Sequence, residues 1–515
     1  MAGCSRRYLV LLLRYNRTGF LFFWVTRMKV QIVCRSCCLL AAVILFFSNS
    51  VVAQQPERPN FIFVLADDVS AEDLGCYGHP TIKTPNLDRL AEKGLRFDSA
   101  YLTISSCSPS RCSMISGRYP HNTGACELHT TLPVGQFMYP QSLKDAGYYT
   151  VLSGKNHMGP ETKKAFSKIS RGKGPGKEGD WVELLKQRPK DKPFFCWFAS
   201  TDAHRNWNFS EEVKRYDPKE AVVPPYLIDG PLTRQDLADY YHEVSRIDFY
   251  VGKIMAELKR QKIDDQTYVI FCADNGRPFP RCKTRLYDSG IKTPLIVWHK
   301  DKVKQGATAS LVSSIDICAT VLELAGVPID DRVQGVSFKK ILTDPTANIR
   351  DFVFAEHNWH VFQAHERMIR YRNMVLIQNN YADRMNMCVE SAPKFPSGKE
   401  LWDAHDNSAK MSKAQADLFL KSRPKFELFD VSADPNQTKN LALDPAYTAI
   451  RQKMQKNLEY WSQQTGDTIP EKPTPDREDV YGKKIAGFRR GEMPGASKNA
   501  QEIKSKGPVR EEPIR

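Results

Sequence analysis

The sequence has neither the cysteine–histidine spacing of a zinc finger nor the signature of an RNA-binding domain, so nothing in it favours binding to nucleic acid. It also lacks internal repeats, which argues against a repeat array. The apolar run 37–47 is too short to span a membrane comfortably, and we expect no stable membrane insertion. The 515 residues, 41% of them hydrophobic, are those of an ordinary globular protein with at least two domains.

Acidic residues are missing from positions 1–53, which carry seven of the basic residues. Without these, the formal net charge of +15 falls to +8, which would suit a polyanionic substrate or only a solvated basic surface. From Met28 onward a basic stretch, the apolar run and small residues ending at Ala53 predict a signal peptide cleaved before Gln54. We therefore expect export to the periplasm, the extracellular space or a lysosome-like compartment, with translation starting at Met1 or Met28.

Cysteine usage fits an exported protein with one special thiol. Four of the 13 cysteines lie within residues 1–53, so nine remain, which is an odd number. At least one must stay unpaired, and Cys107 is the obvious candidate. Cys196, Cys272 and Cys318 lie inside apolar runs and are interpreted as buried free thiols.

Apolar runs at 60–66, 148–152, 194–199 and 268–273 each end in a polar cluster. Near-continuous apolar strands indicate a sheet buried on both faces, which means parallel strands joined by crossover helices. The sequence thus predicts an α/β fold, a large and mostly parallel sheet sandwiched by helices. Ligands bind beyond the carboxyl ends of such strands, so the polar clusters should meet at one edge.

The pattern changes after the first domain. We expect a catalytic domain over 57–355 and a smaller α+β C-terminal subdomain over 356–470, which begins with short, arginine-rich alternating segments. The spacing predicts a helix over 312–325 ending at Gly326, and another over 447–463. From 471 to 515 the chain is rich in proline, glycine and lysine, which predicts an irregular basic tail.

Hard oxygen ligands follow the first and last of these strands: Asp67, Asp68, Asp274 and Asn275. Such ligands select Ca²⁺ or Mg²⁺, whereas zinc would require more histidine. Taken singly, each residue could be a helix cap or a turn. Their common position at strand ends favours a metal site.

The segment Cys107-Ser108-Pro109-Ser110-Arg111, followed by Ser116-Gly117-Arg118, resembles the signature of the sulfatase family. The resemblance implies a fold like that of alkaline phosphatase and a maturation enzyme that converts Cys107 to formylglycine. The hydrate of this aldehyde is the family's nucleophile. Read without the family, the segment is a turn of small residues.

The resemblance also implies roles for the other polar residues. It implies a Ca²⁺ site formed by Asp67, Asp68, Asp274, Asn275 and the modified Cys107. It implies a catalytic or sulfate-binding set made of Arg111, Lys155, His157, His204 and Lys283. Fixed lysine and arginine charges stabilise the negative charge of a sulfuryl group, and a histidine can donate the leaving-group proton.

Segments 154–162 and 275–280 are similar to the sulfamidase-like branch of the family, within a resemblance that covers 57–465. That branch has arginine where this chain has Lys283, so the leaving group is open between an ester and a sulfamate. The expected function is removal of sulfate from a glycosaminoglycan or other sulfated polysaccharide. The alternatives are a phosphonate or phosphodiester hydrolase and a non-catalytic protein that binds sulfated glycans.

Substrate specificity in such proteins is expected to come from loops around the sulfate pocket. His360 and Arg367, in and after the segment 356–360, are the candidate sugar-binding residues, because donors stand there beside an aromatic ring. A structural loop is the competing interpretation. The other histidines considered are interpreted as ordinary polar residues: His121, His129, His242, His299 and His405.

Overall fold

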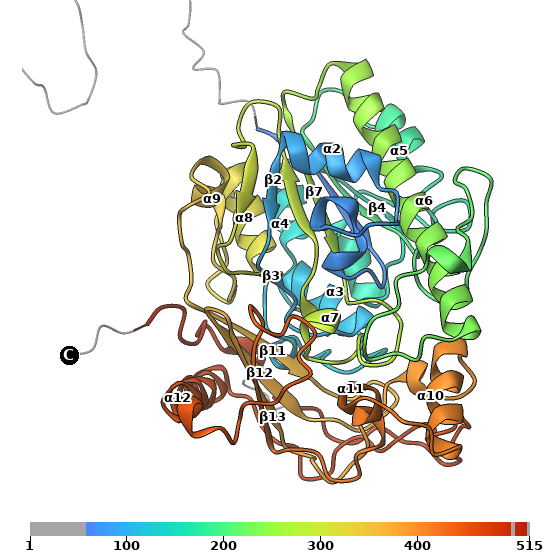
Figure 1. Ribbon diagram of the computed structural model, residues 1–515. Coiled ribbons are helices and arrows are strands. Elements are labelled where there is room, and N and C mark those ends of the chain that lie inside the picture. The colour runs from blue at the N-terminus through green and yellow to red at the C-terminus, as the bar shows by residue number, and fades with distance from the viewer. Residues whose placement is uncertain (1–57, 496–499, 512–515) are drawn as a thin grey trace, which may run out of the picture. The chain divides into compact units, whose positions relative to one another are not determined.

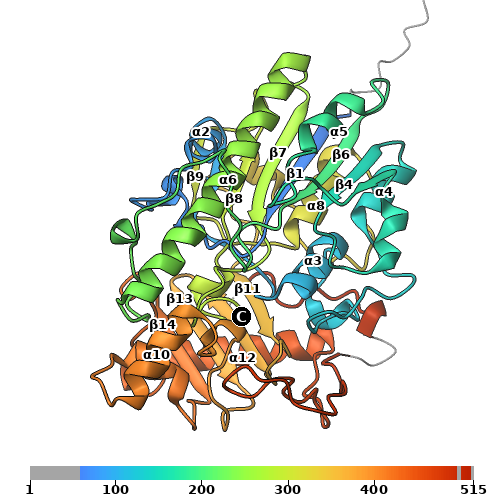
Figure 2. The ribbon, with the colours of Figure 1, turned by 90° about the vertical axis from the view of Figure 1, so that its right-hand side faces the viewer.

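A computed structural model describes residues 58–495 and 500–511, so the signal-peptide prediction lies outside the described residues. The eight-stranded central sheet has the strand order β5-β4-β6-β1-β7-β8-β2-β9 (Figure 2). Its four central strands are β1 (Asn60–Ala66), β4 (Tyr149–Gly154), β6 (Phe194–Ala199) and β7 (Thr267–Ala273). They are mutually parallel, as the apolar runs predicted.

The sheet is mixed because one strand runs against its neighbours. β8 (Leu295–Trp298) is antiparallel to both β7 and β2 (Leu95–Phe97), whereas β5 (Lys168–Ser170) and β9 (Gly306–Thr308) add parallel edges. The mostly parallel sheet expected from the sequence is therefore confirmed.

Both faces of this sheet are buried, because alternate residues of β1 enter two different cores. Phe61 and Phe63 pack on one side with α3 (Cys107–Ser116), α4 (Tyr139–Asp145) and α8 (Asp316–Ala325). Ile62 and Val64 pack on the other side with α2 (Pro85–Lys93), α5 (Trp181–Gln187) and α6 (Pro231–Gln261). The predicted sandwich of helices around a sheet is confirmed (Figures 1 and 2).

The C-terminal part forms a second, antiparallel sheet, which lies at the lower end of the molecule in both ribbon views (Figures 1 and 2). Its four strands are β11 (Phe352–His357), β12 (Glu366–Tyr371), β13 (Met374–Asn379) and β14 (Phe426–Asp430). α12 (Thr448–Thr465) packs on it through Trp461, whose ring stacks on Phe354 at 5.1 Å. The shorter helices are α7 (Asp288–Ile291), α9 (Lys339–Thr343), α10 (Pro396–Asp406) and α11 (Lys413–Ala416).

One predicted helix begins later than its apolar spacing indicated. Val312 and Ser313 form the short strand β10, which pairs with β3 (Ala100–Tyr101), and α8 starts only at Asp316. The Asp316 carboxylate accepts a hydrogen bond from the Ser313 backbone at 2.8 Å, which stabilises the extended entry into the helix. The expected glycine C-cap at Gly326 is confirmed, with a φ of 65°.

The described part of the tail is irregular apart from one short 3-10 helix (Ala500–Glu502). It is nevertheless fixed to the rest of the chain, because Trp359 donates a hydrogen bond to the Pro475 carbonyl at 2.7 Å. Arg118 likewise donates to the carbonyls of Ala500 and Ile503, at 3.1 and 3.0 Å. Within the described residues, no helix is both long and apolar enough to cross a membrane.

Candidate active site

The polar clusters meet because neighbouring parallel strands end at the same level. In the register of the sheet, Ala66 pairs with Ala273, and Gly154 pairs with Ala199. The residues that follow these ends are Asp67 and Asp68 after β1, Lys155 after β4, His204 after β6, and Asp274 and Asn275 after β7. The polar residues thus lie at the carboxyl ends of the parallel strands, where the sequence predicted that they would meet.

Three carboxylates lie together at this edge without solvent. Asp67, Asp68 and Asp274 each offer an oxygen, and these oxygens all lie within 4.8 Å of one another. All three residues have an exposed fraction of 0%. Like charges at this separation in a buried site repel strongly, so cations must compensate them.

Three basic side chains provide part of this compensation. Lys283 Nζ lies 2.7 Å from both oxygens of Asp68, and Arg111 Nε lies 2.7 Å from Asp274 Oδ2. Lys155 Nζ donates a hydrogen bond to Asp67 Oδ2. Each predicted cation at this edge is thus bound to a different predicted metal ligand.

The environment moves the pKa values of two carboxyls in opposite directions. Burial raises the pKa of Asp68, but the nearby charges, chiefly Lys283, outweigh it, so the net pKa is lowered. Burial also raises the pKa of Asp274, and there Arg111 does not fully offset it. Asp68 is therefore held as a carboxylate, whereas the charge of Asp274 depends more on a further cation.

The residues present fit a hard divalent cation. Asp67 Oδ1 and Asn275 Oδ1 are buried and have no hydrogen-bond partner among the described residues. Unpaired buried oxygens are costly unless something binds them, and oxygen donors are the ligands of Ca²⁺. Asn275 Nδ2 donates to Asp68 Oδ1 at 2.6 Å, which orients the amide so that its oxygen is the free atom.

Cys107 occupies the first turn of α3, after the N-cap Ser106. Its exposed fraction is 2%, and burial raises the pKa of the thiol despite the opposing charges of Lys155 and Lys283. A thiol with a raised pKa is a poor nucleophile, so an unmodified Cys107 has little chemistry to offer here. Arg111 lies one helical turn later and faces the same edge, bonded to Asp274.

A cavity of about 510 Å³ opens beside these groups. It is lined by Asp67, His129, Lys155, His157, Thr201, Asp202, His204, Arg205, Asn206 and Asn208. It therefore contains both histidines expected from the sequence. It also contains His129, although the sequence pattern indicates only an ordinary polar residue there.

The three histidines differ in environment. Burial, aided by the charges of Lys155 and Arg111, lowers the pKa of His157 to about 2, so its ring is neutral at physiological pH. His204 Nδ1 contacts the Arg205 carbonyl, which only accepts hydrogen bonds, so Nδ1 carries a proton. The ring of His129 lies 4.9 Å from that of His157, a proximity that no pattern in the sequence indicates.

The two candidate substrate residues are placed differently. His360 is buried next to the site, with Nδ1 at 2.6 Å from the hydroxyl of Ser106, the neighbour of Cys107. The structure does not bring Arg367 to the cavity. Its guanidinium is buried and donates two hydrogen bonds to Asp467, at 2.6 and 2.7 Å.

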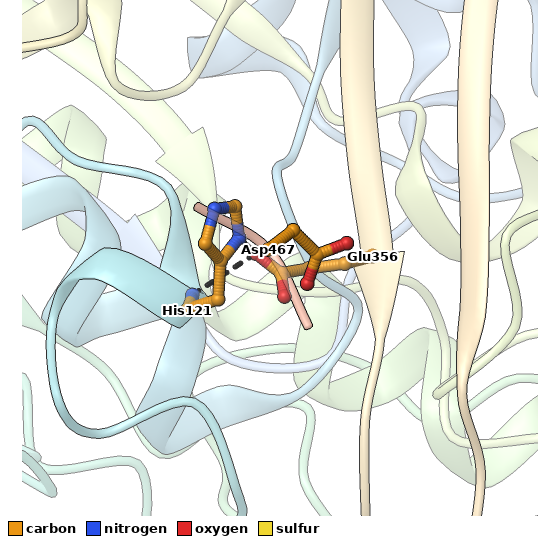
Figure 3. A group of neighbouring side chains, drawn as sticks. All are labelled: His121, Glu356 and Asp467. Carbon is orange, nitrogen blue, oxygen red and sulfur yellow. Dashed lines mark hydrogen bonds and ion pairs between the residues drawn. The ribbon is translucent and has the colours of Figure 1, made fainter. Parts of the chain in front are cut away.

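Arg367 instead belongs to a buried cluster with His121, Glu356 and Asp467, three of whose members Figure 3 shows side by side. His121 Nδ1 lies 2.9 Å from Glu356 Oε1, and Arg367 NH2 lies 3.7 Å from the other oxygen of Glu356. His121 Nε2 faces the Thr465 carbonyl at 3.2 Å. Because the carboxylates are already paired with Arg367 and bound by the His121 ring, the cluster is a structural polar network.

All nine cysteines of the described residues are free thiols, and eight are buried. The interpretation of Cys196, Cys272 and Cys318 as buried free thiols is confirmed. In particular, no disulfide joins Cys107 to Cys112.

Comparison with known proteins gives two family matches. Residues 59–177 and 179–327 match the sequence model of the sulfatase family. Residues 282–385 match that of the C-terminal part of N-sulphoglucosamine sulphohydrolase. Together these matches cover both the central sheet and most of the antiparallel sheet.

Similar proteins cover about four fifths of this chain. Human N-sulphoglucosamine sulphohydrolase is 30% identical over 461 residues, which are 80% of this chain and 91% of that protein. An ulvan-active sulfatase from Formosa agariphila is 26% identical over 81% of this chain and 77% of its own length.

Solved structures share the fold at lower identity. One of them is a protein solved in complex with its substrate, D-glucosamine-2-N,6-O-disulfate. Its structure matches this chain with a TM-score of 0.62 and 19% identity, covering 79% of this chain and 98% of that chain. A 2-O glycosaminoglycan sulfatase has a TM-score of 0.60 and 19% identity, covering 79% of this chain and 92% of that chain.

Proposed function

We propose, from the premise that this chain belongs to the sulfatase family, that it uses a formylglycine made from Cys107 and a bound Ca²⁺ to desulfate a carbohydrate. The bond cleaved is a sulfate ester or a sulfamate. The observation that carries the proposal is the buried set of Asp67, Asp68 and Asp274, paired with three cations around the Cys107 end of α3.

The basic residues act by charge. Hydrolysis of a sulfate ester builds negative charge on the leaving oxygen and spreads it over the sulfuryl group. Lys155, Lys283 and Arg111 are held in place by buried hydrogen bonds, so they need not reorganise during the reaction. Such preorganised charges stabilise the transition state more than the same groups would in water.

The metal and the modified residue fit this arrangement. Asp67, Asp68, Asp274 and Asn275 would hold Ca²⁺, which when bound polarises sulfuryl oxygens. Formylglycine at position 107 supplies, as its hydrate, an attacking oxygen that a buried thiol of raised pKa does not.

Two of the cavity histidines act as a hydrogen-bond acceptor and a proton donor. The ring of His157 is neutral because its pKa is lowered to about 2, so a ring nitrogen can accept a hydrogen bond from a hydroxyl. His204 Nδ1 faces the Arg205 carbonyl, so Nε2 is the ring nitrogen left to act on the leaving atom. Protonated Nε2 is the group that donates to the leaving atom.

The C-terminal family match supports an N-sulfated amino sugar as the substrate class. Lys283 leaves the linkage open between a sulfate ester and a sulfamate, because its point charge can stabilise negative charge developing on a leaving oxygen or nitrogen without the fork geometry of arginine. Export remains part of the proposal, and N-terminal sequencing of the secreted protein should find Gln54 first.

The direct test is mass spectrometry of the peptide spanning Cys107, after expression with a formylglycine-generating enzyme. The peptide should carry the mass of formylglycine, and the modified fraction should scale with turnover of a sulfated oligosaccharide. Cys107→Ala should lose turnover while keeping its melting temperature. Cys112→Ala, in the same helix, should keep most activity. An unmodified cysteine in a fully active enzyme would refute the proposed nucleophile.

A further inference from the structure

The C-terminal tail packs against Trp359, one residue before His360. The Trp359 ring stacks on Phe488 at 5.3 Å, and its Nε1 donates to the Pro475 carbonyl at 2.7 Å. The backbone of Arg477 donates to the Val361 carbonyl at 2.8 Å. Tail residues 475–490 are thus fixed beside the segment that precedes and follows His360.

This contact holds two arginines over one indole ring. The guanidinium carbons of Arg477 and Arg490 lie 5.6 and 4.9 Å from the centroid of Trp359. A guanidinium over an aromatic face is attracted to the ring and can still donate hydrogen bonds through the N–H groups in its own plane. Both positive charges therefore lie near the same aromatic ring.

Arg477 lacks an ion-pair partner in the part of the chain that the structure describes. Among the described residues, its side chain forms no ion pair or hydrogen bond, and its Nε is buried without a partner. Arg490 is partly neutralised, since it donates to Glu127 Oε2 at 3.1 Å and to the Leu128 carbonyl. The two guanidinium groups and the Glu127 carboxylate together carry a net charge of +1.

The arginines stand next to the catalytic cavity. Arg490 bonds to the carbonyl of Leu128, the residue before His129, and His129 lines the cavity. The His129 backbone donates to the Ser108 hydroxyl at 2.8 Å, one residue from Cys107. Burial, together with the charges of Arg477 and Arg490, lowers the pKa of His129, so the neutral ring offers a hydrogen bond without adding charge.

We propose that His129, Arg477 and Arg490 form a basic rim that binds a second anionic group of the substrate, on the sugar next to the one carrying the scissile sulfate. The group is a carboxylate or a sulfate, which guanidinium groups bind through paired, charge-assisted hydrogen bonds. An uncompensated Arg477 beside a second arginine is the arrangement expected of such an anion site.

This inference rests on the proposed function and narrows it. Substrates would have to carry at least two anionic groups on neighbouring sugars. The tail beyond residue 470, which neither family match reaches, would then determine specificity.

The test uses the full-length chain and a heparin tetrasaccharide, whose affinity for Cys107→Ala is measured by calorimetry. Adding Arg477→Gln should weaken binding about tenfold, the loss expected for one charge-assisted interaction. In kinetics, Arg477→Gln in the active enzyme should lower kcat/KM for the oligosaccharide by a similar factor. Its effect on an aryl sulfate, which has no second anion, should be several-fold smaller.

Arg489→Gln is the matched control, because Arg489 is exposed in the same tail and the substitution removes the same charge. A carboxyl-reduced tetrasaccharide separates the two anions: loss of the Arg477→Gln effect assigns the carboxylate, and its persistence assigns the sulfate. If Arg477→Gln and Arg489→Gln weaken tetrasaccharide binding equally, the proposed basic rim is wrong. It is also wrong if the tetrasaccharide does not bind to Cys107→Ala at all. Binding that depends on Arg477 without turnover would overturn the proposed function alone.

Discussion

At the residue scale, the raised pKa of Glu127 makes the stability of the folded protein depend on pH. Burial raises the pKa of Glu127 from 4.5 to about 7, against the hydrogen bond from Thr474 and the charge of Arg490. A carboxyl whose pKa is higher in the folded state stabilises the fold below the unfolded pKa. That stabilisation is lost as the pH rises through the folded value.

We therefore expect the melting temperature of the wild type to fall between pH 5 and pH 8, and Glu127→Gln to flatten part of this fall. The contribution of Glu127 is at most about 3.5 kcal/mol, since each pKa unit corresponds to about 1.4 kcal/mol. Glu92→Gln, at a carboxyl with 67% exposure, should leave the pH profile unchanged. Parallel profiles for wild type and Glu127→Gln would show that the carboxyl titrates normally.

At the residue scale, the sequence predicts the groups whose position follows from a strand. Asp67, Asp274 and Lys155 each come directly after a buried run, so their meeting could be expected. Lys283 and Cys107 lie in a loop and a helix and are indicated only by the family motif. His129 and Arg477 could not be found, because their approach depends on long-range packing of loops and tail.

At the scale of secondary-structure elements, the ends of β1 and β7 carry the buried carboxylates. Buried carboxylates converge there because β1 lies directly beside β7, and a bound cation is the natural counterpart. A ligand that binds only the folded state stabilises it by about 2.7 kcal/mol when its concentration is a hundred times its dissociation constant. Metal removal should therefore act on stability as well as on activity.

We predict that chelation lowers the melting temperature and the turnover of the wild type, and that added Ca²⁺ restores both. Asp274→Ala should have lost most of this response, because one carboxylate of the buried set is gone. Asp406→Ala, at a carboxylate with 64% exposure, should respond like wild type. A wild type that contains no metal and ignores the chelator would exclude the metal site.

β12 presents a second test at the element scale. It carries Arg367 into the buried network with Glu356 on β11 and Asp467 after α12. Removing one member of a buried ion pair leaves the other uncompensated, which costs about 3–5 kcal/mol.

Arg367→Ala should therefore lower the free energy of unfolding by this amount and reduce activity on all substrates in parallel. Lys399→Ala breaks an exposed pair with Asp403 and should cost less than about 1 kcal/mol. A stable Arg367→Ala protein with a raised KM only for oligosaccharides would return Arg367 to substrate binding.

Elements with one dominant pattern could be predicted, and elements with competing signals could not. The central strands and α12 follow from continuous or periodic apolar residues. The stretch 312–315 has helical spacing, but pairing of β10 with β3 and the Asp316 side chain hold it extended. Backbone pairing with a distant strand does not appear in local periodicity.

At the scale of the whole molecule, the tail connects parts that are far apart in the sequence. Its first described half packs on Trp359, and its second half reaches the C-terminal end of α3 through Arg118. Arg118 is the last residue of the sulfatase-like motif, and it is buried. The composition predicted an irregular tail, but it could not indicate where the tail docks, because proline- and lysine-rich segments carry no periodic apolar face.

The final prediction concerns a chain that ends after Gly495. Arg118 NH2 would lose its acceptors on Ala500 and Ile503, and burial already lowers the pKa of Arg118 to about 10. Burying these donors without acceptors costs about 1–3 kcal/mol for each lost bond. The truncated chain should therefore unfold at lower urea concentration, followed by tryptophan fluorescence.

Turnover should fall together with stability, because α3 also carries Cys107 and Arg111. Lys504→Ala is the control, since its ion pair with Asp331 is 61% and 67% exposed and contributes little. Restoring the tail as a separate peptide should recover part of the lost stability, because docking would again satisfy Arg118. Coincident unfolding curves for the truncated and full-length chains would mean that water replaces the tail carbonyls, and that the end of α3 holds Cys107 in place without the tail.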